Sequence, residues 1–316
     1  MEHFCGRIVL VTGGGGFLAA NLCRRLLELG ARVHVVVRPA TGTPWRWRGM
    51  EAQPVPHYAD LADGAAIQEM VGQVAPEYVF HLAATGGYQK RVIKGPILAD
   101  NVLGTCNLLT ALASVDCRCL VYTAGSLELG PQNEPLTETT PLRPVSFYGA
   151  AKAAATLFVQ QATRESGQPC VILRPFSIYG PWEAPGRLIP SAIRAALTKT
   201  VLPLTPPGLR RDFIFVADVV DACLLAATTP RACGETMHIA SGIQSSNEEV
   251  VACIQKILGE PIVTAVGAYP LRQSDMHHRV VDNRKAGQLL GWQPRHTLEQ
   301  GLARTIDWFR ATYQEL

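Results

Sequence analysis

The chain of 316 residues carries few charged side chains and no run of like charge. Charged residues make up 17% of the sequence, and 29 Lys and Arg against 26 Asp and Glu leave a formal net charge of +3 at pH 7. Soluble proteins average ~25% charged residues. Proteins that bind nucleic acid or membranes through basic segments concentrate Lys and Arg locally. The composition therefore argues against both partners and indicates a compact globular protein.

The sequence also lacks a segment able to cross a membrane. No apolar stretch approaches the ~20 residues that a bilayer requires. The first 17 residues carry Glu2 and Arg7 and contain four consecutive glycines, which is unlike a secretory signal. We therefore expect a cytoplasmic protein with no membrane partner.

Metal-binding and redox spacings are missing too. The nine cysteines are scattered singly, except for Cys117 and Cys119, which lie one residue too close for a C-x-x-C pair. The eight histidines show no H-E-x-x-H spacing, and the pair His277–His278 is interpreted as a loop feature. We expect reduced thiols and no metal.

What the sequence does contain is an alternation of strand-like and helix-like segments. Leucines at helical spacing over residues 18–27 follow the first apolar run. Short apolar runs occur at residues 7–11, 33–37, 78–80, 119–122 and 170–173. With one more apolar stretch before Asp60, this pattern predicts about six strands in an α/β fold, a doubly wound parallel sheet of the Rossmann type.

The character of the chain changes near Pro175. Beyond it, prolines interrupt the sequence at Pro181, Pro185, Pro190, Pro203, Pro206 and Pro207. This predicts a dinucleotide-binding domain over residues 1–174, to which the chain returns around 212–240. Residues 175–211 and 241–316 are expected to form a smaller carboxy-terminal substrate-binding lobe.

A glycine-rich turn separates the first strand from the first helix. Residues 11–19 read VTGGGGFLA. In this context a dinucleotide's pyrophosphate would meet backbone N–H groups and the helix dipole, and a Cβ would hold the phosphate away. The turn predicts dinucleotide binding through Gly13, Gly15, Gly16, Phe17 and Leu18.

The end of the second strand bears on which dinucleotide binds. Val37 occupies the position where an acidic residue would bind the ribose hydroxyls of NAD, and Arg38 is the next residue. A guanidinium there can pair with a 2′-phosphate or stack on adenine. The cofactor is therefore expected to be NAD(P), with NADP favoured and NAD left open.

Tyr148 and Lys152 lie four residues apart on a helix-like segment, so both point the same way. A phenol with an ordinary pKa of about 10 is a poor acid–base group at neutral pH, but an ammonium one turn away favours its anion. Tyr148 is expected to exchange a proton with a hydroxyl or ketone while a nicotinamide exchanges hydride at the same carbon.

These motifs together resemble the extended, nucleotide-sugar-modifying branch of the short-chain dehydrogenase/reductase superfamily. The chain matches its T-G-x-x-G-x-x-G turn with Ala19 in place of the last glycine, its Y-x-x-x-K pair and its N-V-x-G-T-x-N-L-L helix at residues 101–109. The likeness runs from Val9 to about Phe309. It implies that Lys152 holds the nicotinamide ribose. Further cofactor contacts are implied for Asp60, Leu61, Leu82, Ala83, Ala84, Asn101, Tyr148, Lys152 and Pro175.

The third catalytic residue of that branch is a Ser or Thr just after a strand, and here the match is incomplete. The usual position holds Gly125, so Ser126 is the preferred candidate, with Thr123 as the alternative. Sugar dehydratases of the branch carry an acidic pair directly after this hydroxyl, whereas Ser126 is followed by Leu127. Dehydration is therefore disfavoured, and Glu128 is expected to contact substrate or to be a structural carboxylate.

The predicted substrate lobe carries further segments of the same resemblance, including L-R-P-x-S-I-Y-G-P, R-L-I-P and R-D-F-I-F-V-x-D-V. Two arginines of this lobe, Arg211 and Arg272, suit a diphosphate, because each guanidinium can make charge-assisted hydrogen bonds to it. Surface salt bridges are the alternative role for these arginines. The substrate-binding residues implied are Ser126, Glu128, Ser177, Arg187, Leu188, Arg211 and Arg272, with Asp275 beside the last.

The resemblance implies an NAD(P)-dependent enzyme that acts at C4 of a nucleotide-diphosphate sugar, as a 4-epimerase or 4-ketoreductase. An NADPH-dependent reductase of a hydrophobic ketone, a nucleotide-sugar dehydratase and a non-catalytic dinucleotide-binding regulator are the alternatives. A homodimer is expected from surplus apolar residues on two helices, among them Leu103, Leu108, Ala151, Ala155 and Phe158.

Overall fold

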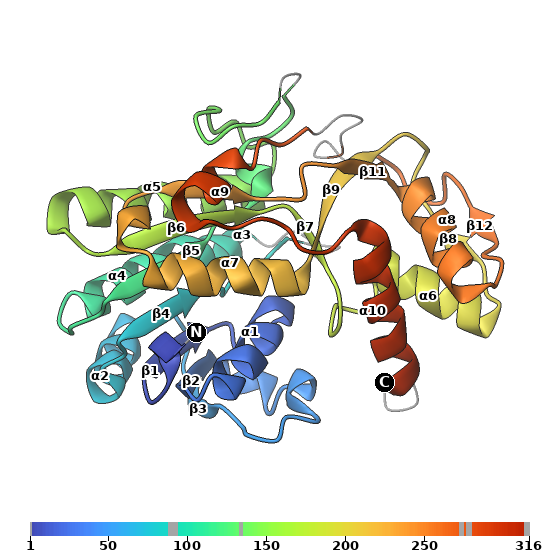
Figure 1. The fold of residues 1–316 in the computed structure, drawn as a ribbon. Coiled ribbons are helices and arrows are strands. Elements are labelled where there is room, and N and C mark those ends of the chain that lie inside the picture. Colours follow the sequence, from blue (N-terminus) through green and yellow to red (C-terminus); the bar gives the residue numbers. More distant parts are fainter. Residues whose placement is uncertain (1, 88–93, 133–134, 272–274, 276–279, 313–316) are drawn as a thin grey trace.

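A seven-stranded parallel sheet forms the larger part of the molecule (Figure 1). The computed structural model describes residues 2–87, 94–132, 135–271, 275 and 280–312. The strand order is β10-β6-β5-β4-β1-β2-β3, and every neighbouring pair is parallel. The strands are β1 (Ile8–Thr12), β2 (Arg32–Val37), β3 (Val55–Tyr58), β4 (Tyr78–His81), β5 (Cys119–Thr123), β6 (Cys170–Pro175) and β10 (Thr236–Ile239). The predicted Rossmann-type fold is confirmed, with β10 as one strand more than expected.

Helices cover both faces of this sheet, which explains why most of its strands are predominantly apolar. Val9 and Val11 pack into the cluster on one face, and Leu10 between them packs into the cluster on the other. The first face carries α1 (Phe17–Glu28), α7 (Val216–Thr228) and α9 (Arg284–Leu290). The second face carries α2 (Gly64–Val74), α4 (Gly104–Leu112) and α5 (Phe147–Ser166), while α3 (Lys94–Leu98) and the π-helical η4 (Ala99–Leu103) lead into α4.

A smaller lobe lies beside the sheet and has its own apolar core (Figure 1). Its three-stranded sheet has the order β11 (Gln244–Ser246), β9 (Arg210–Phe215) and β7 (Ser177–Tyr179). A two-stranded sheet pairs β12 (Thr264–Ala265) with β8 (Leu202–Pro203). The lobe's helices are α6 (Leu188–Thr198), α8 (Asn247–Leu258) and α10 (Leu298–Thr312).

Short 3-10 turns occur elsewhere along the described chain. They are η1 (Glu2–Phe4), η2 (Pro39–Thr41), η3 (Trp45–Trp47), η5 (Ser126–Glu128) and η6 (Pro230–Ala232).

The chain passes between the two parts more than once. β6 ends at Pro175 in the large sheet, and β7 begins at Ser177 in the small one. β9 pairs in the small sheet, whereas α7 directly after it and β10 pack with the large sheet. The end of β6 and the turn after β1 therefore lie near the small lobe, against whose core Phe17 and Leu18 pack. The domain boundaries themselves stay a prediction.

The nine cysteines form no disulfide, and burial raises the pKa of the Cys117 thiol to about 12. Among the described residues, no three His, Cys, Asp or Glu side chains gather as metal ligands would. The described helices also include none with the length and apolar composition of a membrane span. The pair His277–His278 lies outside the described residues.

Candidate active site

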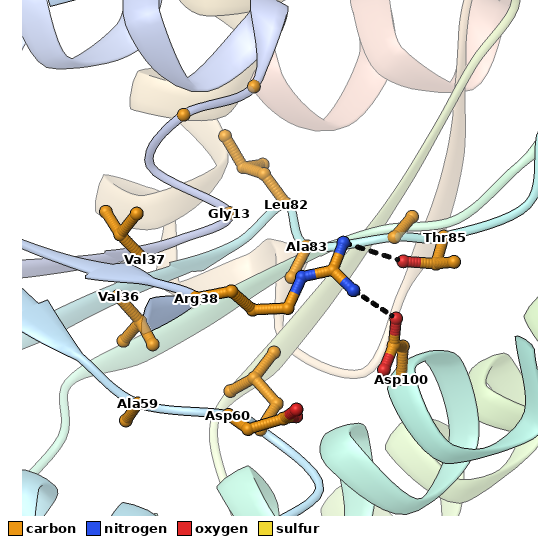
Figure 2. Close-up of a pocket in the computed structure, with 14 residues that line it drawn as sticks. Gly13, Val36, Val37, Arg38, Ala59, Asp60, Leu82, Ala83, Thr85 and Asp100 are labelled. Atoms are coloured by element: carbon orange, nitrogen blue, oxygen red, sulfur yellow. Dashed lines mark hydrogen bonds and ion pairs between the residues drawn. The ribbon is translucent and has the colours of Figure 1, made fainter. Parts of the chain in front are cut away.

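A cavity of about 280 Å³ opens at the carboxyl ends of β1, β2 and β4 (Figure 2). In an open parallel sheet this is the edge where ligands bind. Nine of the predicted cofactor residues line it: Gly13, Gly15, Gly16, Arg38, Asp60, Leu61, Leu82, Ala83 and Ala84. Five further residues line it, of which only Val37 was expected near the cofactor: Val36, Val37, Ala59, Thr85 and Asp100. Thr85 and Asp100 could have been inferred from the sequence, since Thr85 follows the predicted Ala84 and Asp100 precedes the predicted Asn101.

The glycine turn is pressed against the end of β4. Gly13 has φ +70°, and a Cβ there would lie 2.8 Å from the backbone Cα of Ala83. The next helix, α1, begins after Gly16 with no side-chain cap. Its first-turn N–H groups therefore have no side-chain acceptor from the cap position, which suits a pyrophosphate. Phe17 and Leu18 supply that first turn, and their side chains pack against the small lobe's core. The turn thus fits a dinucleotide.

Two residues of η3 hold the glycine turn from outside. The Nη1 of Arg46 donates to the Gly15 carbonyl at 3.1 Å, and the indole Nε1 of Trp47 donates to the Gly14 carbonyl at 3.0 Å. Arg46 also donates from Nε to the Trp182 carbonyl at 2.7 Å, which joins the turn to the loop after β7. Neither residue was predicted to take part in the site, and their local signal is the alternation of tryptophan and arginine at residues 45–48.

Arg38 lies across the cofactor cavity, where Figure 2 shows its guanidinium between Thr85 and Asp100. Nη1 donates to Oδ2 of Asp100 at 3.1 Å, and Nη2 donates to Oγ1 of Thr85 at 3.3 Å. The Arg38 side chain is still 55% exposed. A partly exposed cation therefore lines the cavity and is paired with the carboxylate of Asp100, which was not among the predicted cofactor residues.

Asn101 corrects one predicted cofactor contact. Its side chain is 1% exposed, and its amide donates to the carbonyls of Thr85 and Ile97, each at 2.8 Å. Its Oδ1 accepts from the Thr85 N–H at 3.1 Å. With all these bonds made to backbone, Asn101 positions Thr85 at the cavity wall and does not itself line the cavity.

The Tyr148–Lys152 pair lies on the first turns of α5. Ser146 caps this helix by accepting from the Gly149 N–H at 3.0 Å. Lys152 is buried, with its ammonium 4.2 Å from the centre of the Tyr122 ring and donating to the Thr123 carbonyl at 2.7 Å. Burial lowers the pKa of Lys152 to about 8, and the charge of Glu128 opposes that shift. The ammonium is thus held in one place and stays mostly protonated at neutral pH.

Gly125 is the residue at the end of β5 that faces this pair. A Cβ on it would lie 3.9 Å from the Tyr148 hydroxyl and 3.8 Å from Cγ of Lys152. The chain therefore has a bare backbone where a side-chain hydroxyl would reach Tyr148. The Thr123 hydroxyl donates to the His81 carbonyl at 3.0 Å, so its hydrogen is already bonded to the backbone of β4. Ser126 begins η5 and stays a prediction as the third catalytic residue.

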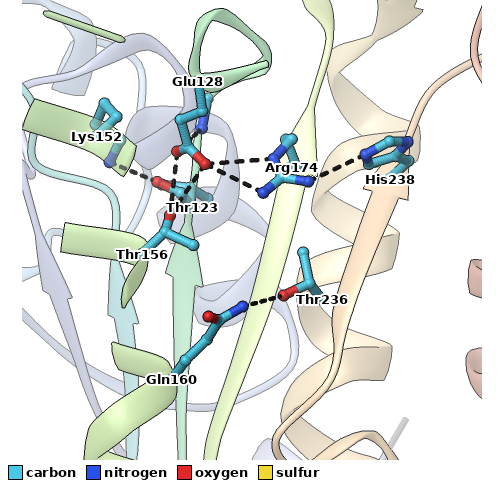
Figure 3. Close-up of polar contacts among 9 residues, drawn as sticks. Thr123, Glu128, Lys152, Thr156, Gln160, Arg174, Thr236 and His238 are labelled. Atoms are coloured by element: carbon cyan, nitrogen blue, oxygen red, sulfur yellow. Dashed lines mark hydrogen bonds and ion pairs between the residues drawn. The ribbon is translucent and has the colours of Figure 1, made fainter. Parts of the chain in front are cut away.

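Glu128 is wholly buried, and Figure 3 shows its carboxylate directed toward Thr156 and Arg174. Its oxygens accept from the Gly125 N–H at 2.7 Å and from the Thr156 hydroxyl at 3.1 Å, and it pairs with Arg174 at 3.2 Å. A carboxylate with 0% exposure does not reach a substrate. Of the two roles expected for Glu128, the substrate contact is therefore wrong and the structural carboxylate is what the structure shows.

The predicted substrate residues that follow β6 lie on or beside elements of the small lobe. Ser177 begins β7, two residues after Pro175 ends β6. Arg187 precedes α6, which Leu188 begins, and its Nε donates to Glu183 at 3.2 Å. Arg211 on β9 pairs with Asp275 at 3.4 Å, whereas Arg272 lies outside the described residues. Arg211 therefore makes an ion pair in this structure, and its expected role in diphosphate binding stays a prediction.

Comparison with known proteins covers nearly the whole chain. The NAD dependent epimerase/dehydratase family matches residues 9–240. UDP-glucose 4-epimerase of Mycolicibacterium smegmatis is 30% identical over 310 residues, 95% of this chain and 98% of that protein. dTDP-glucose 4,6-dehydratase of Neisseria meningitidis serogroup B is 31% identical over 332 residues, 96% and 93% of the two chains. The solved structure of Thermus thermophilus UDP-glucose 4-epimerase in complex with NAD has a TM-score of 0.84 and 27% identity, over 96% of this chain and 98% of that one.

Proposed function

This chain belongs to the NAD dependent epimerase/dehydratase family, and from that membership we propose that it oxidises or reduces C4 of a nucleotide-diphosphate sugar, as a 4-epimerase or 4-ketoreductase. The family and its named relatives make it an NAD(P)-dependent enzyme of nucleotide sugars. The observation that carries the proposal is the buried ammonium of Lys152, fixed to the Thr123 carbonyl one helical turn from Tyr148.

Different residues of the chain are proposed to bind the cofactor, transfer the proton and orient the substrate. The glycine turn and α1 would hold the dinucleotide's pyrophosphate, and the cavity beside Arg38 would hold its adenosine. When bound, NAD(P) takes or gives a hydride at the reacting carbon. Tyr148 takes or gives the proton on that carbon's oxygen, and the nearby ammonium of Lys152 stabilises the phenolate form. Ser126, Ser177, Arg187 and Leu188 are proposed to orient the sugar and its diphosphate.

The position of Glu128 favours C4 oxidoreduction over dehydration. Removing a C5 proton and expelling a C6 hydroxyl require acid–base groups that reach the sugar. Ser126 is followed by Leu127, and Glu128 is turned inward onto Arg174 with no exposure. Glu128, the acidic residue nearest to Ser126 in the sequence, is thus paired with Arg174 inside the protein. The dehydratase relatives support the family and the nucleotide-sugar class.

Product analysis and cofactor absorbance together test the function. Purified protein is incubated with uridine- and thymidine-diphosphate hexoses and with their 4-keto derivatives, in the presence of NAD(H) or NADP(H). Inversion at C4 without net change in nicotinamide absorbance identifies an epimerase, and lasting oxidation of added NADPH identifies a reductase. Lack of both reactions, with no rise in melting temperature on adding nucleoside diphosphates, would contradict the proposal and favour a hydrophobic ketone as substrate.

We propose that NADP is preferred, and Arg38→Ala tests this. The change should weaken NADPH binding about ten- to a hundred-fold, because a partly exposed charge-assisted contact contributes on the order of 1.5–3 kcal/mol. NADH binding should change much less, since it has no 2′-phosphate to pair. The measurement is a fluorescence titration of both cofactors.

The matched control is Arg32→Ala, which removes an exposed arginine from the other end of β2. It should leave both affinities in place. Equal losses of NADPH and NADH in Arg38→Ala would mean that the guanidinium only stacks on adenine. Tight NADH binding by the unmutated protein would move the preference to NAD and the reaction towards epimerisation.

A homodimer and a cytoplasmic location remain proposals. The structure corrects three residues used for the dimer, because Leu108, Ala151 and Ala155 are buried in the chain's own core. An exposed apolar surface on α3, η4 and α5 remains in support, formed by Leu98, Leu103, Phe147, Leu157 and Phe158. Sedimentation at micromolar concentration should give twice the 34.2 kDa mass of the chain. Phe158→Glu should shift the protein to monomer, and a wild-type protein that sediments only as monomer would contradict the proposal.

A further inference from the structure

A buried ion pair lies directly behind the Tyr148–Lys152 pair, and the proposed reaction does not use it. The side chains of Glu128 and Arg174 are 0% and 3% exposed. Arg174 donates to Oε2 of Glu128 from both Nη2 and Nε, and its Nη1 lies 3.1 Å from Nε2 of His238 (Figure 3). A buried ion pair is not by itself a strong source of stability, because desolvation offsets its attraction. Its position next to reacting groups therefore calls for another explanation.

The carboxylate of Glu128 ties together the two elements that carry the site. Its Oε1 accepts from the N–H of Gly125, the residue whose Cα faces the Tyr148 hydroxyl. Both of its oxygens accept from the hydroxyl of Thr156, which lies on α5 four residues after Lys152. A shift of Glu128 would thus move the end of β5 relative to the helix that carries the tyrosine and the lysine. One side chain sets the spacing of the site.

Glu128 also supplies a negative charge to a crowded group of ionisable side chains. Burial alone lowers the pKa of Lys152, and the charge of Glu128 is what opposes the shift. The other groups facing that ammonium do not supply an anion when Tyr148 is protonated, because burial lowers the pKa of His81 to about 3 and raises that of Tyr122. The groups around Lys152 are His81 on β4, Tyr122 on β5, Glu128 on η5, Tyr148 on α5 and, paired with Glu128, Arg174 on β6.

We propose that Glu128 is a positioning residue for the Tyr148–Lys152 pair, holding Gly125 and α5 in register and balancing the buried ammonium with its carboxylate. The assignment of proton transfer to Tyr148 rests on the proposed function, whereas the electrostatic effect of Glu128 does not. Arg174 acts through Glu128 by fixing the direction of the carboxylate. Neither side chain touches the substrate.

Removing one charge at a time distinguishes this role from a merely structural one. Glu128→Gln keeps the shape and an acceptor for Gly125 but removes the negative charge. Both Tyr148 and Lys152 then lose their protons at lower pH, since a missing anion destabilises every neighbouring protonated cation and favours neighbouring anions. The pH profile of kcat/KM should move down by about one pH unit on both limbs. Arg174→Gln removes the positive charge instead, so its profile should move up.

A titration of the phenolate provides a readout that needs no turnover. The ultraviolet difference absorbance between the unmutated protein and Tyr148→Phe reports ionisation of Tyr148. The midpoint should fall in Glu128→Gln, each variant being compared with its own Tyr148→Phe partner, and should rise in Arg174→Gln. Gln160→Ala is the matched control, because it removes a bond of α5 to Thr236 that involves neither Glu128 nor a charge, and it should leave the midpoint in place.

The outcomes separate the two proposals. If no nucleotide sugar is turned over but the midpoints move in opposite directions, the proposed function fails and the role of Glu128 stands. If Glu128→Gln does not fold, Arg174→Gln carries the same test with the opposite sign. Midpoints that stay in place in every folded variant, or that move in the same direction in both, would overturn the inference.

Discussion

Replacing Tyr148 by phenylalanine should reduce turnover by about 100- to 10,000-fold, the range expected when a positioned acid–base group is lost. The ring is retained, so its packing between Gly87 and Gly125 is preserved and only the hydroxyl disappears. NAD(P) affinity should therefore stay near normal. The measurement is kcat on the nucleotide sugar identified by product analysis, with cofactor binding followed by fluorescence.

Two further variants serve as comparisons for Tyr148→Phe. Tyr58→Phe is the matched control, since the Tyr58 side chain is 50% exposed and does not line the cofactor cavity. Its turnover should match that of the unmutated protein. Lys152→Ala should lower both turnover and cofactor affinity, because it removes the ammonium that is proposed to stabilise the phenolate and to hold the nicotinamide ribose. A Tyr148→Phe enzyme that kept more than a tenth of the rate would show that another group carries the proton.

Gly13→Ala should lower the free energy of unfolding by about 2–5 kcal/mol, the sum of left-handed backbone strain and overpacking. The new Cβ would lie 2.8 Å from Cα and 2.9 Å from N of Ala83, and backbone atoms cannot rotate away as a side chain can. The turn must then shift away from β4, which moves the N–H groups that would hold the pyrophosphate. We expect loss of NAD(P) binding together with the lower stability, measured by urea unfolding and cofactor titration.

Gly6→Ala provides a closely matched control. Gly6 has φ +71°, nearly the value at Gly13, but a Cβ on it would have no atom within 4 Å. It should cost only the backbone strain of about 1–2 kcal/mol and leave cofactor binding unchanged. Equal destabilisation by the two substitutions, with cofactor binding retained in both, would refute the close approach of the glycine turn to β4.

Most of the fold was accessible from local sequence patterns. The apolar run of β1, the glycine turn and the leucines of α1 each have a short-range signature, and the sequence predicted all three in the correct order. β10 was not counted among the strands, because Thr236–Ile239 reads TMHI, with polar residues in two of four positions. All four residues are buried, since β6 on one side and flanking helices on both faces cover them. Their burial comes from the neighbouring elements and has no local signature.

The cofactor cavity was predicted better than the roles of individual polar residues. The glycines, Arg38 and Asp60 line it as expected. Asn101 and Glu128 lie in the expected neighbourhood but turn inward, because their partners Thr85 and Arg174 come from other elements. Residue type and motif position place a side chain near a site. They do not decide whether it faces the solvent or the core.

The sequence by itself determined the family, the α/β sheet and the four-residue spacing of Tyr148 and Lys152, because strand periodicity, glycine turns and helical spacing are properties of adjacent residues. Only the tertiary structure decided which charges meet. Arg38 pairs with Asp100 62 positions later, and Glu128 pairs with Arg174 46 positions later. Such pairings depend on which strand ends and helices the packed sheet brings together, and burial of the second pair turns an apparent substrate contact into support for the site.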